Sequence, residues 1–201
     1  MDDLVVMALF RHGLTEANKR HAYLGWTDSP LCEKVQRASC NYEHLFSSDL
    51  GRCLETAKIM FSDSSIEILS EFREMNFGLW EGKTYEDLKH DLDYQNWLST
   101  PFSFKPPDGE SFTEFSERVE QGFAKVIETV MVSTVRKAAI VTHGGVIRYL
   151  LTKYAPEKKD FWEWKAAHGQ GFEFVWKLDD LRSGDRCTLL REVPLMENLN
   201  G

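Results

Sequence analysis

The sequence predicts an α/β fold: a three-layer α/β/α sandwich with a mostly parallel central sheet. Two short runs, residues 4–10 and 138–142, are almost wholly apolar, which is typical of strands that are buried on both faces. Segments with helical spacing alternate with strand-like segments along most of the chain, and this alternation favours a parallel sheet between helical layers. The chain has 201 residues and no internal repeat or linker, so residues 1–201 are expected to form one domain.

The expected elements follow one another in the order that such a fold requires. Strands are predicted at residues 4–10, 44–47, 66–69, 138–142, 172–178 and 187–193. Helices are predicted at about 31–40, 50–61, 84–97, 111–130 and 146–154. The clearest helix begins at Ser111, because Ser111 and Glu114 form a capping box and apolar residues fall on one face as far as Val130.

Two of the other helices carry more specific expectations. Ser48 and Asp49 are both suitable N-caps for the helix that starts near Leu50. The helix at 84–97 would turn four side chains inward: Tyr85, Leu88, Leu92 and Trp97. The stretch 71–82, which is rich in aromatic residues and carboxylates, has no clean period and is expected to be an ordered loop.

Composition argues against several classes of function. The net charge is −8, so a general nucleic-acid or anionic-membrane surface is not expected. No stretch has the length of a transmembrane helix and the N-terminus lacks the pattern of a signal peptide, so a cytoplasmic protein is predicted. The four cysteines contain no C-x-x-C pair and are expected to be reduced. No metal-binding motif is present, so neither a metal nor a cofactor is predicted, and the oligomeric state stays open.

A histidine followed by glycine ends both of the apolar strands. His12-Gly13 follows the first strand and His143-Gly144 follows the fourth. If these strands are parallel neighbours, both imidazoles reach the same crevice at the carboxyl edge of the sheet. Arg11 precedes the first histidine, and Arg52 lies in the first turn of a helix, where anions are favoured. In an acidic protein, such a local cluster of cations and imidazoles indicates a phosphate site.

Phosphoryl transfer needs positioning and electrostatic stabilisation of the transferred group. A histidine can serve as the nucleophile and form a phosphoramidate, which divides one difficult step into two easier ones. The leaving alkoxide needs a proton, so a carboxylic acid is expected nearby. Three residues of the aromatic loop are candidates, and composition alone does not choose among them: Glu71, Glu74 and Glu81.

Six motifs in order resemble those of the histidine phosphatase, or phosphoglycerate mutase-like, superfamily. Residues 11–18 match R-H-G-x-T-x-x-N, and residues 25–31 are similar to G-x-x-D-x-P-L. Residues 47–52 are similar to S-S-D-L-x-R, and residues 73–82 to R-E-x-x-F-G-x-W-E-G. Gly109-Glu110-Ser111 and the V-T-H-G-G of residues 141–145 complete the set. The resemblance covers roughly residues 4–154 and implies the phosphoglycerate mutase-like fold.

The resemblance also implies a role for each matched residue. His12 would be the phosphorylated nucleophile, and Glu74 would protonate the leaving group and later activate water. Arg11, Arg52 and His143 would bind the phosphoryl oxygens. The substrate pocket would be lined by Thr15, Asn18, Gly144, Leu24 and Gly25. The family uses no metal, and its smaller members hydrolyse small phosphorylated metabolites.

Departures from the family pattern lie away from this core chemistry. The segment after Pro30-Leu31 is short, which would shorten or remove one covering helix, and Leu24 stands where glutamine is common. The favoured function is hydrolysis of small phosphomonoesters through phospho-His12. Two alternatives remain: a cofactor-dependent phosphoglycerate mutase, which is usually a longer chain, and a phosphate-binding regulatory module without turnover.

Overall fold

The computed structural model describes residues 3–38, 40–62 and 64–193. Its centre is a six-stranded sheet in the order β3-β2-β4-β1-β5-β6. The strands are β1 (Leu4–Arg11), β2 (His44–Ser47), β3 (Ile66–Ile68), β4 (Lys137–Thr142), β5 (Gly171–Lys177) and β6 (Leu189–Val193). The first four pair in parallel, and β5 is antiparallel to both β1 and β6. The predicted α/β fold with a mostly parallel sheet is therefore confirmed.

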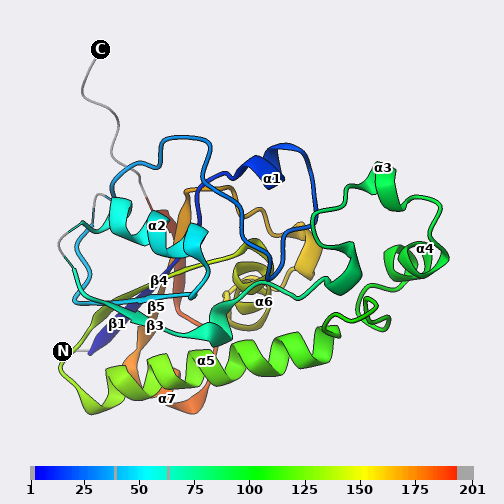
Figure 1. Ribbon diagram of the computed structural model, residues 1–201. Coiled ribbons are helices and arrows are strands. Elements are labelled where there is room, and N and C mark those ends of the chain that lie inside the picture. The colour runs from blue at the N-terminus through cyan, green and yellow to red at the C-terminus, as the bar shows by residue number, and fades with distance from the viewer. Residues whose placement is uncertain (1–2, 39, 63, 194–201) are drawn as a thin grey trace.

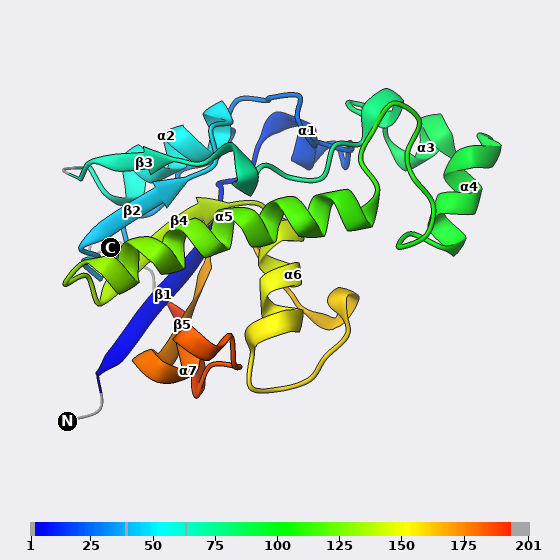
Figure 2. The ribbon, with the colours of Figure 1, turned by 90° about the horizontal axis from the view of Figure 1, so that it is seen from below.

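Helices cover the sheet on both faces, as Figures 1 and 2 show. One face packs against α5 (Phe112–Val132), α6 (Gly144–Tyr154) and α7 (Leu178–Ser183), and the other against α2 (Gly51–Met60). Successive residues of β1 serve the two faces in turn: Met7 and Leu9 join the α5 side, whereas Ala8 and Phe10 join the α2 side. An almost wholly apolar β1 is the consequence of this double burial.

The long helix α5 forms as the sequence predicts. Ser111 Oγ accepts the Glu114 N–H at 3.2 Å, and the Glu114 carboxylate accepts the Ser111 N–H at 2.7 Å, so the capping box is complete. Buried residues repeat along one face of the helix: Phe115, Val119, Phe123, Val126 and Val130. In Figure 2 this helix crosses in front of the strands, and its apolar face supplies much of the larger core.

The helix predicted at 31–40 is absent from the described residues 31–38 and 40. Leu31 instead forms an isolated β-bridge with Thr15, and the Cys32 N–H bonds to the Leu14 carbonyl. Val35 and Ala38 of this non-helical segment pack on the α2 side of the sheet. A loop thus replaces a covering helix there, and the strand residues beneath it stay buried.

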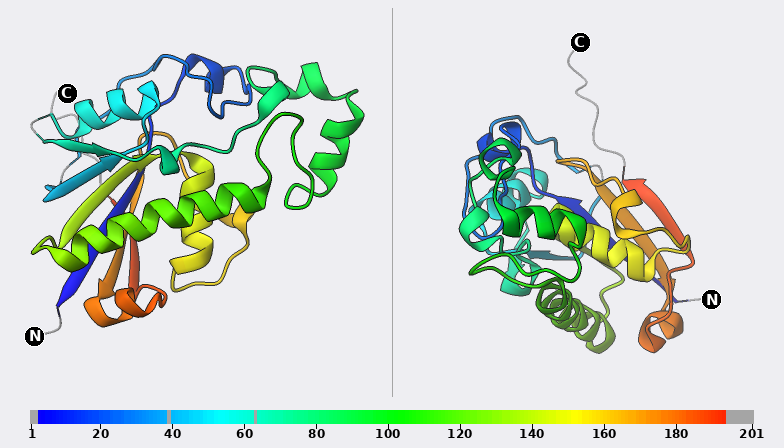
Figure 3. Two further views of the ribbon diagram at one scale, coloured as in Figure 1. Left: turned by 60° about the horizontal axis from the view of Figure 1, so that its bottom comes forward. Right: turned by 90° about the vertical axis from the view of Figure 1, so that its right-hand side faces the viewer.

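The predicted helix at 84–97 is two helices, α3 (Tyr85–Leu88) and α4 (Leu92–Ser99). Thr84 caps α3 with Asp87, and Asp91 Oδ1 accepts the Tyr94 N–H at 3.0 Å to start α4. Tyr85 and Leu92, the first residues of the two helices, are exposed and their inward assignment is wrong, whereas Leu88 and Trp97 are buried as predicted. Figure 3 shows both helices standing at one end of the molecule, away from the sheet.

Smaller differences concern short elements and their ends. Stretch 71–82 contains two single turns of 3-10 helix, Ser70–Phe72 and Gly78–Trp80, within the predicted ordered loop. Helix α6 begins at Gly144, two residues earlier than predicted. Three short helices are not predicted from the sequence: α1 (Glu16–Lys19), η3 (Phe161–Glu163) and α7.

Candidate active site

The two histidines that end apolar strands lie side by side. Strands β1 and β4 are parallel neighbours with Arg11 opposite Thr142, so His12 and His143 leave the sheet at the same edge. Their ring centroids are 5.1 Å apart, with the planes inclined at 61°. Residues 131 positions apart in the numbering thus converge at the carboxyl ends of the parallel strands, where ligands bind in open α/β sheets.

His12 is held as a neutral imidazole with one available lone pair. Its Nδ1 lies 2.7 Å from the Gly13 carbonyl oxygen; since a carbonyl only accepts, Nδ1 carries the proton and Nε2 the lone pair. The side chain is 3% exposed. Nε2 has no hydrogen-bond partner among the described residues. It is also absent from the buried, unpartnered nitrogens of those residues, so Nε2 keeps some contact with solvent.

Burial and nearby cations keep both histidines neutral. Burial lowers the pKa of His12 well below its ordinary value, and the guanidiniums of Arg52 and Arg11 lower it further. Burial and Arg52 likewise depress the pKa of His143, which is 0% exposed and lies 3.1 Å from Ser48 Oγ through Nε2. A neutral His12 at physiological pH is the form that can attack phosphorus.

Arg52 is fixed beneath this pair by backbone carbonyls. It is 1% exposed and donates to the Gly25 oxygen at 2.6 Å and the Thr27 oxygen at 2.9 Å. The predicted cap of its helix α2, by Ser48 or Asp49, is wrong: Leu50 occupies the N-cap position without a side-chain bond. The carboxylate of Asp28, from a distant loop, accepts the Gly51 N–H at 2.5 Å and the Arg52 N–H at 3.3 Å instead.

Arg11 and Arg52 share an unusual feature. Arg11 donates to the Ala166 oxygen at 2.6 Å, yet its Nε has no partner, and the Nε of Arg52 has none either, as far as the described residues reach. Burial lowers the pKa of Arg11 to about 10, opposed by the nearby Glu74 charge. Buried N–H groups are normally satisfied, and an anion between the two guanidiniums would supply the missing acceptors.

The geometry distinguishes the three candidate acids. The Glu74 carboxylate accepts the Gly145 N–H at 2.9 Å, so it faces the start of α6, directly after His143-Gly144. Glu71 instead pairs with Lys125, and Glu81 accepts the Trp26 and Thr27 N–H groups. Arg73, the neighbour that could have neutralised Glu74 at the surface, pairs with Asp49. Glu74 is therefore the carboxyl group that the fold delivers to the histidines.

Arg118 of α5 braces the backbone that carries Glu74. Its guanidinium donates to the carbonyls of residues 71, 73 and 74, at 2.7, 3.1 and 3.3 Å. It also forms two bonds with the Glu110 carboxylate, at 2.8 and 2.7 Å, and Glu110 accepts the Asn76 N–H. The pair is largely buried, with side-chain exposures of 18% and 11%. This brace connects the clearest helix of the fold to the candidate acid.

The five predicted pocket residues divide into different structural roles. Thr15 Oγ1 donates to Asn18 Oδ1 at 2.8 Å and caps the short helix α1. Leu24 packs with two alanines, Ala17 and Ala22. The Gly25 carbonyl accepts a hydrogen bond from the Arg52 guanidinium. Gly144 approaches Arg11 so closely that an added Cβ would lie 3.1 Å from the guanidinium carbon. Its N–H has no partner among described residues, whereas the Gly13 N–H is taken by Thr56 Oγ1.

Several residues at the site were not selected from the sequence. The ring of His168 lies 5.1 Å from that of His12, its Nδ1 is 3.2 Å from the His12 carbonyl, and burial lowers its pKa to about 4. Cys53 Sγ lies 3.4 Å from His143 Nε2. Asp28 and Ser48 are identified in the sequence only as members of motifs, with Ser48 also a possible helix cap. The contacts of His168 and Cys53 arise in tertiary structure and leave no local pattern.

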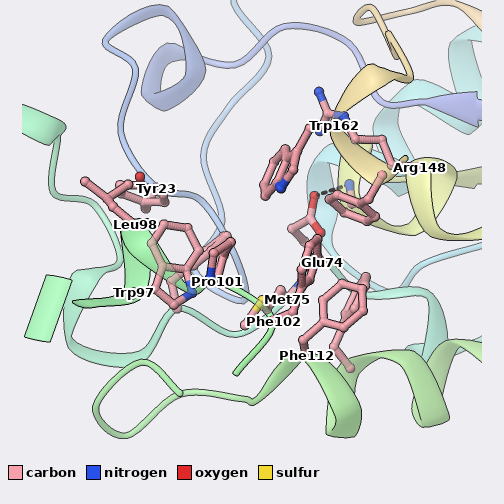
Figure 4. A pocket seen from close by; sticks show the side chains of 14 residues that line it. Tyr23, Glu74, Met75, Trp97, Leu98, Pro101, Phe102, Phe112, Arg148 and Trp162 are labelled. Carbon is pink, nitrogen blue, oxygen red and sulfur yellow. Dashed lines mark hydrogen bonds between the residues drawn. The ribbon is translucent and has the colours of Figure 1, made fainter. Parts of the chain in front are cut away.

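A cavity of about 430 Å³ opens beside Glu74. Most of its lining is aromatic or aliphatic, as Figure 4 shows. The lining residues are Tyr23, Glu74, Met75, Phe77, Trp97, Leu98, Pro101, Phe102, Phe112, Phe115, Gly145, Arg148, Phe161 and Trp162. None of the five predicted pocket residues is in this set. Glu74 and Gly145 thus connect the histidine pair to a cavity that lies outside the predicted substrate pocket.

The family model for the histidine phosphatase superfamily (branch 1) matches residues 7–171, which include every residue discussed at the two strand ends. The chain belongs to this superfamily. The membership predicted from the six motifs is thereby confirmed, and the match extends to the start of β5, beyond the resemblance found in the sequence.

Known superfamily members resemble the chain along most of its length. Adenosylcobalamin/alpha-ribazole phosphatase of Salmonella typhimurium is 28% identical over 88% of this chain and 90% of that protein. The crystal structure of alpha-ribazole phosphatase from Shigella flexneri is 27% identical with a TM-score of 0.77, covering 85% of this chain and 90% of that one. Phosphoglycerate mutase from Thermus thermophilus is 28% identical with a TM-score of 0.69, covering 96% of this chain and 100% of that one.

Two further findings concern the described residues only. None of the helices within them is both long enough and apolar enough to cross a membrane. No group of three or more histidine, cysteine, aspartate or glutamate side chains among them is arranged to hold a metal ion.

Proposed function

We propose that this superfamily member, as one domain of residues 1–201, hydrolyses small phosphomonoesters through a phosphohistidine at His12. The single observation that carries the proposal is the neutral imidazole whose Nδ1–H is bound to the Gly13 carbonyl, with its ring next to that of His143. The prediction of a phosphomonoesterase agrees with the superfamily and with the phosphatases among its relatives.

In the first step, His12 Nε2 forms a bond to phosphorus as the ester P–O bond breaks. The leaving oxygen takes a proton from Glu74, so the alcohol departs neutral. Arg11, Arg52, His143 and the Gly144 N–H stabilise the charge on the phosphoryl oxygens. In the second step, Glu74 accepts a proton from a water molecule that attacks the phosphohistidine; the P–N bond breaks and inorganic phosphate leaves.

Two rivals are weaker. A phosphoglycerate mutase would share the histidines and arginines, and relatives named as probable mutases exist. The Salmonella typhimurium phosphatase aligns over 88% of this chain against 72% for the probable mutase, and the phosphatase structure has the higher TM-score, although the mutase structure covers more of the chain. A binding module without turnover has no use for a carboxyl group anchored beside the nucleophile, as Glu74 is through Gly145. We place the enzyme in the cytoplasm, where it acts on a small phosphorylated metabolite. The free thiols of Cys32, Cys53 and Cys187 agree with such a reducing compartment.

Rapid quenching during turnover of a ³²P-labelled phosphomonoester tests the proposal. Acid-labile, base-stable label should appear on His12, located by peptide mapping, and inorganic phosphate should be released. Turnover without any labelled histidine would contradict the mechanism. Addition of 2,3-bisphosphoglycerate separates the mutase alternative: strong stimulation of 3-phosphoglycerate isomerisation, in place of phosphate release, would favour the mutase.

A further inference from the structure

The position of the acid fixes where the rest of the substrate must lie. Glu74 protonates the leaving oxygen in the proposed function, so the leaving group extends from the Glu74 side of the phosphoryl centre. Glu74 and Gly145 line the cavity of about 430 Å³, and His12 does not. The carbon skeleton of the leaving alcohol therefore occupies this cavity, which falls in the size range of small-molecule sites.

We propose that the preferred substrates are phosphomonoesters of bulky, uncharged and largely apolar alcohols. The proposal rests on the proposed function and deepens it by assigning a class of leaving group. It differs from the mutase alternative, in which the group beside the acid would be a small carboxylate-bearing glycerate.

The walls of the cavity support an apolar occupant. Twelve of the fourteen lining residues are uncharged, and eight of these carry aromatic rings. Three of the lining side chains are apolar and still substantially exposed: Leu98 at 45%, Phe102 at 47% and Trp162 at 57%. Phe102 and Trp162 come from segments 60 positions apart, yet their rings stack with centroids 6.3 Å apart. Exposed apolar side chains gathered around a hollow are typical of a binding site.

The two charged lining residues both lie at the phosphoryl end. Arg148 interacts electrostatically with Arg11, and its Nε donates to the Trp164 carbonyl at 3.1 Å. In Figure 4, Glu74 and Arg148 lie on one side of the cavity, whereas Tyr23, Trp97 and Leu98 form the opposite side. That opposite side has no ionisable group except the Tyr23 phenol, whose hydroxyl is hydrogen-bonded to the Tyr94 hydroxyl at 2.7 Å. A carboxylate there would lose its hydration without a partner.

The test uses the full chain and esters whose leaving alcohols have similar acidity: ethyl, benzyl and 2-naphthylmethyl phosphate, with 3-phosphoglycerate as the charged comparison. We expect kcat/KM to rise about tenfold or more from ethyl to naphthylmethyl phosphate, the effect of burying an aromatic group. 3-Phosphoglycerate should be poorer than benzyl phosphate. Equal values for all four, or a preference for 3-phosphoglycerate, would overturn the leaving-group proposal and leave the phosphatase function intact. No phosphate release from any ester would overturn both.

Helix α4 offers a matched pair of variants. Leu98 and Leu92 are both exposed leucines on this helix, but only Leu98 lines the cavity. Leu98→Asp should lower kcat/KM for naphthylmethyl phosphate about tenfold and change that for ethyl phosphate less than about twofold. Leu92→Asp should alter neither value. Equal effects of the two substitutions would show that the cavity does not receive the leaving group, and would overturn the proposal.

Discussion

The phosphoryl centre and the cavity beside it are built in different ways. The centre consists of polar groups gathered at the carboxyl ends of buried strands, and backbone atoms fix two of them: the Gly13 carbonyl holds His12, and the carbonyls of Gly25 and Thr27 hold Arg52. The cavity is walled mostly by apolar side chains from loops, from the short helices α4 and η3 and from the first turn of α5, and several of them are exposed. The rigid sheet edge thus holds the chemistry, which tolerates little displacement, and the looser periphery holds the recognition of the leaving group.

The largest effect is expected at the nucleophile. His12→Ala should reduce kcat by at least about 10⁴-fold for every ester, because no other group can form the covalent intermediate. Steady-state phosphate release measures the loss. His168→Asn is the matched control, since His168 also packs on His12 but does not bond to phosphorus; it should cost less than about tenfold. Comparable losses in both variants would mean that ring packing matters rather than nucleophilic attack.

The acid should show its role through the leaving group. Glu74→Gln preserves the shape and leaves an amide oxygen for the Gly145 N–H, but it removes the proton donor. We expect a loss of about 10²–10⁴-fold for benzyl phosphate and a much smaller one for 4-nitrophenyl phosphate, whose phenolate leaves without protonation. A uniform loss for both esters would assign Glu74 to binding rather than to proton transfer.

The brace behind the acid should produce an intermediate effect. Glu110→Gln takes the negative charge from a largely buried pair and leaves Arg118 with a weaker partner. Removal of one partner of such a pair costs about 3–5 kcal/mol when the other charge stays uncompensated, and an isosteric amide should cost less. Urea unfolding should show this loss, with kcat for alkyl esters reduced about tenfold and KM little changed. An unchanged kcat would remove Arg118 and Glu110 from any role in positioning Glu74.

The smallest expected effect is the share of one histidine, His168, in the pH dependence of stability. Burial lowers the pKa values of His12 and His143, and that of His168 to about 4, so below pH 6.5 the unfolded chain binds protons that the folded chain does not. These histidines contribute nothing above pH 6.5 and increasingly destabilise the fold as the pH falls below that value; for His168 the effect levels off below about pH 4. Urea midpoints at several pH values measure the slope, and His168→Asn should reduce it by one histidine. An unchanged slope in that variant would contradict the assignment.

The sequence revealed the phosphoryl centre far better than the cavity, and the reason is physical. The buried strands and their terminal histidines have local signatures: an apolar run, then glycine. The capping box of α5 is equally local. Asp91 was missed as a second helix start because capping residues also occur inside helices, and the helix predicted after Pro30 was wrong because Leu31 pairs with the distant Thr15 in a β-bridge.

Other parts of the site depend on contacts between segments that are distant in the chain. Arg52 donates to backbone carbonyls, and a pattern of side chains in the sequence cannot predict such acceptors. The cavity draws on side chains from several separate segments between Tyr23 and Trp162, and its residues therefore resemble ordinary core aromatics when each is read alone. His168 reaches His12 only because the loop after η3 folds back over the end of β1, where the Gly169 N–H lies near the carbonyls of Arg11 and His12.

Helices α3 and α4 are each started by a cap within their own segment, at Thr84 and Asp91. The residues that start these two helices therefore lie within the segment itself, and the positions of the helix starts depend little on the sheet. Substitutions between residues 92 and 104 can alter the shape of one wall without disturbing the strands that carry the histidines. A library of variants confined to this stretch should consequently yield many folded enzymes with new preferences, and a lineage could change its metabolite by the same route while its reaction stays the same.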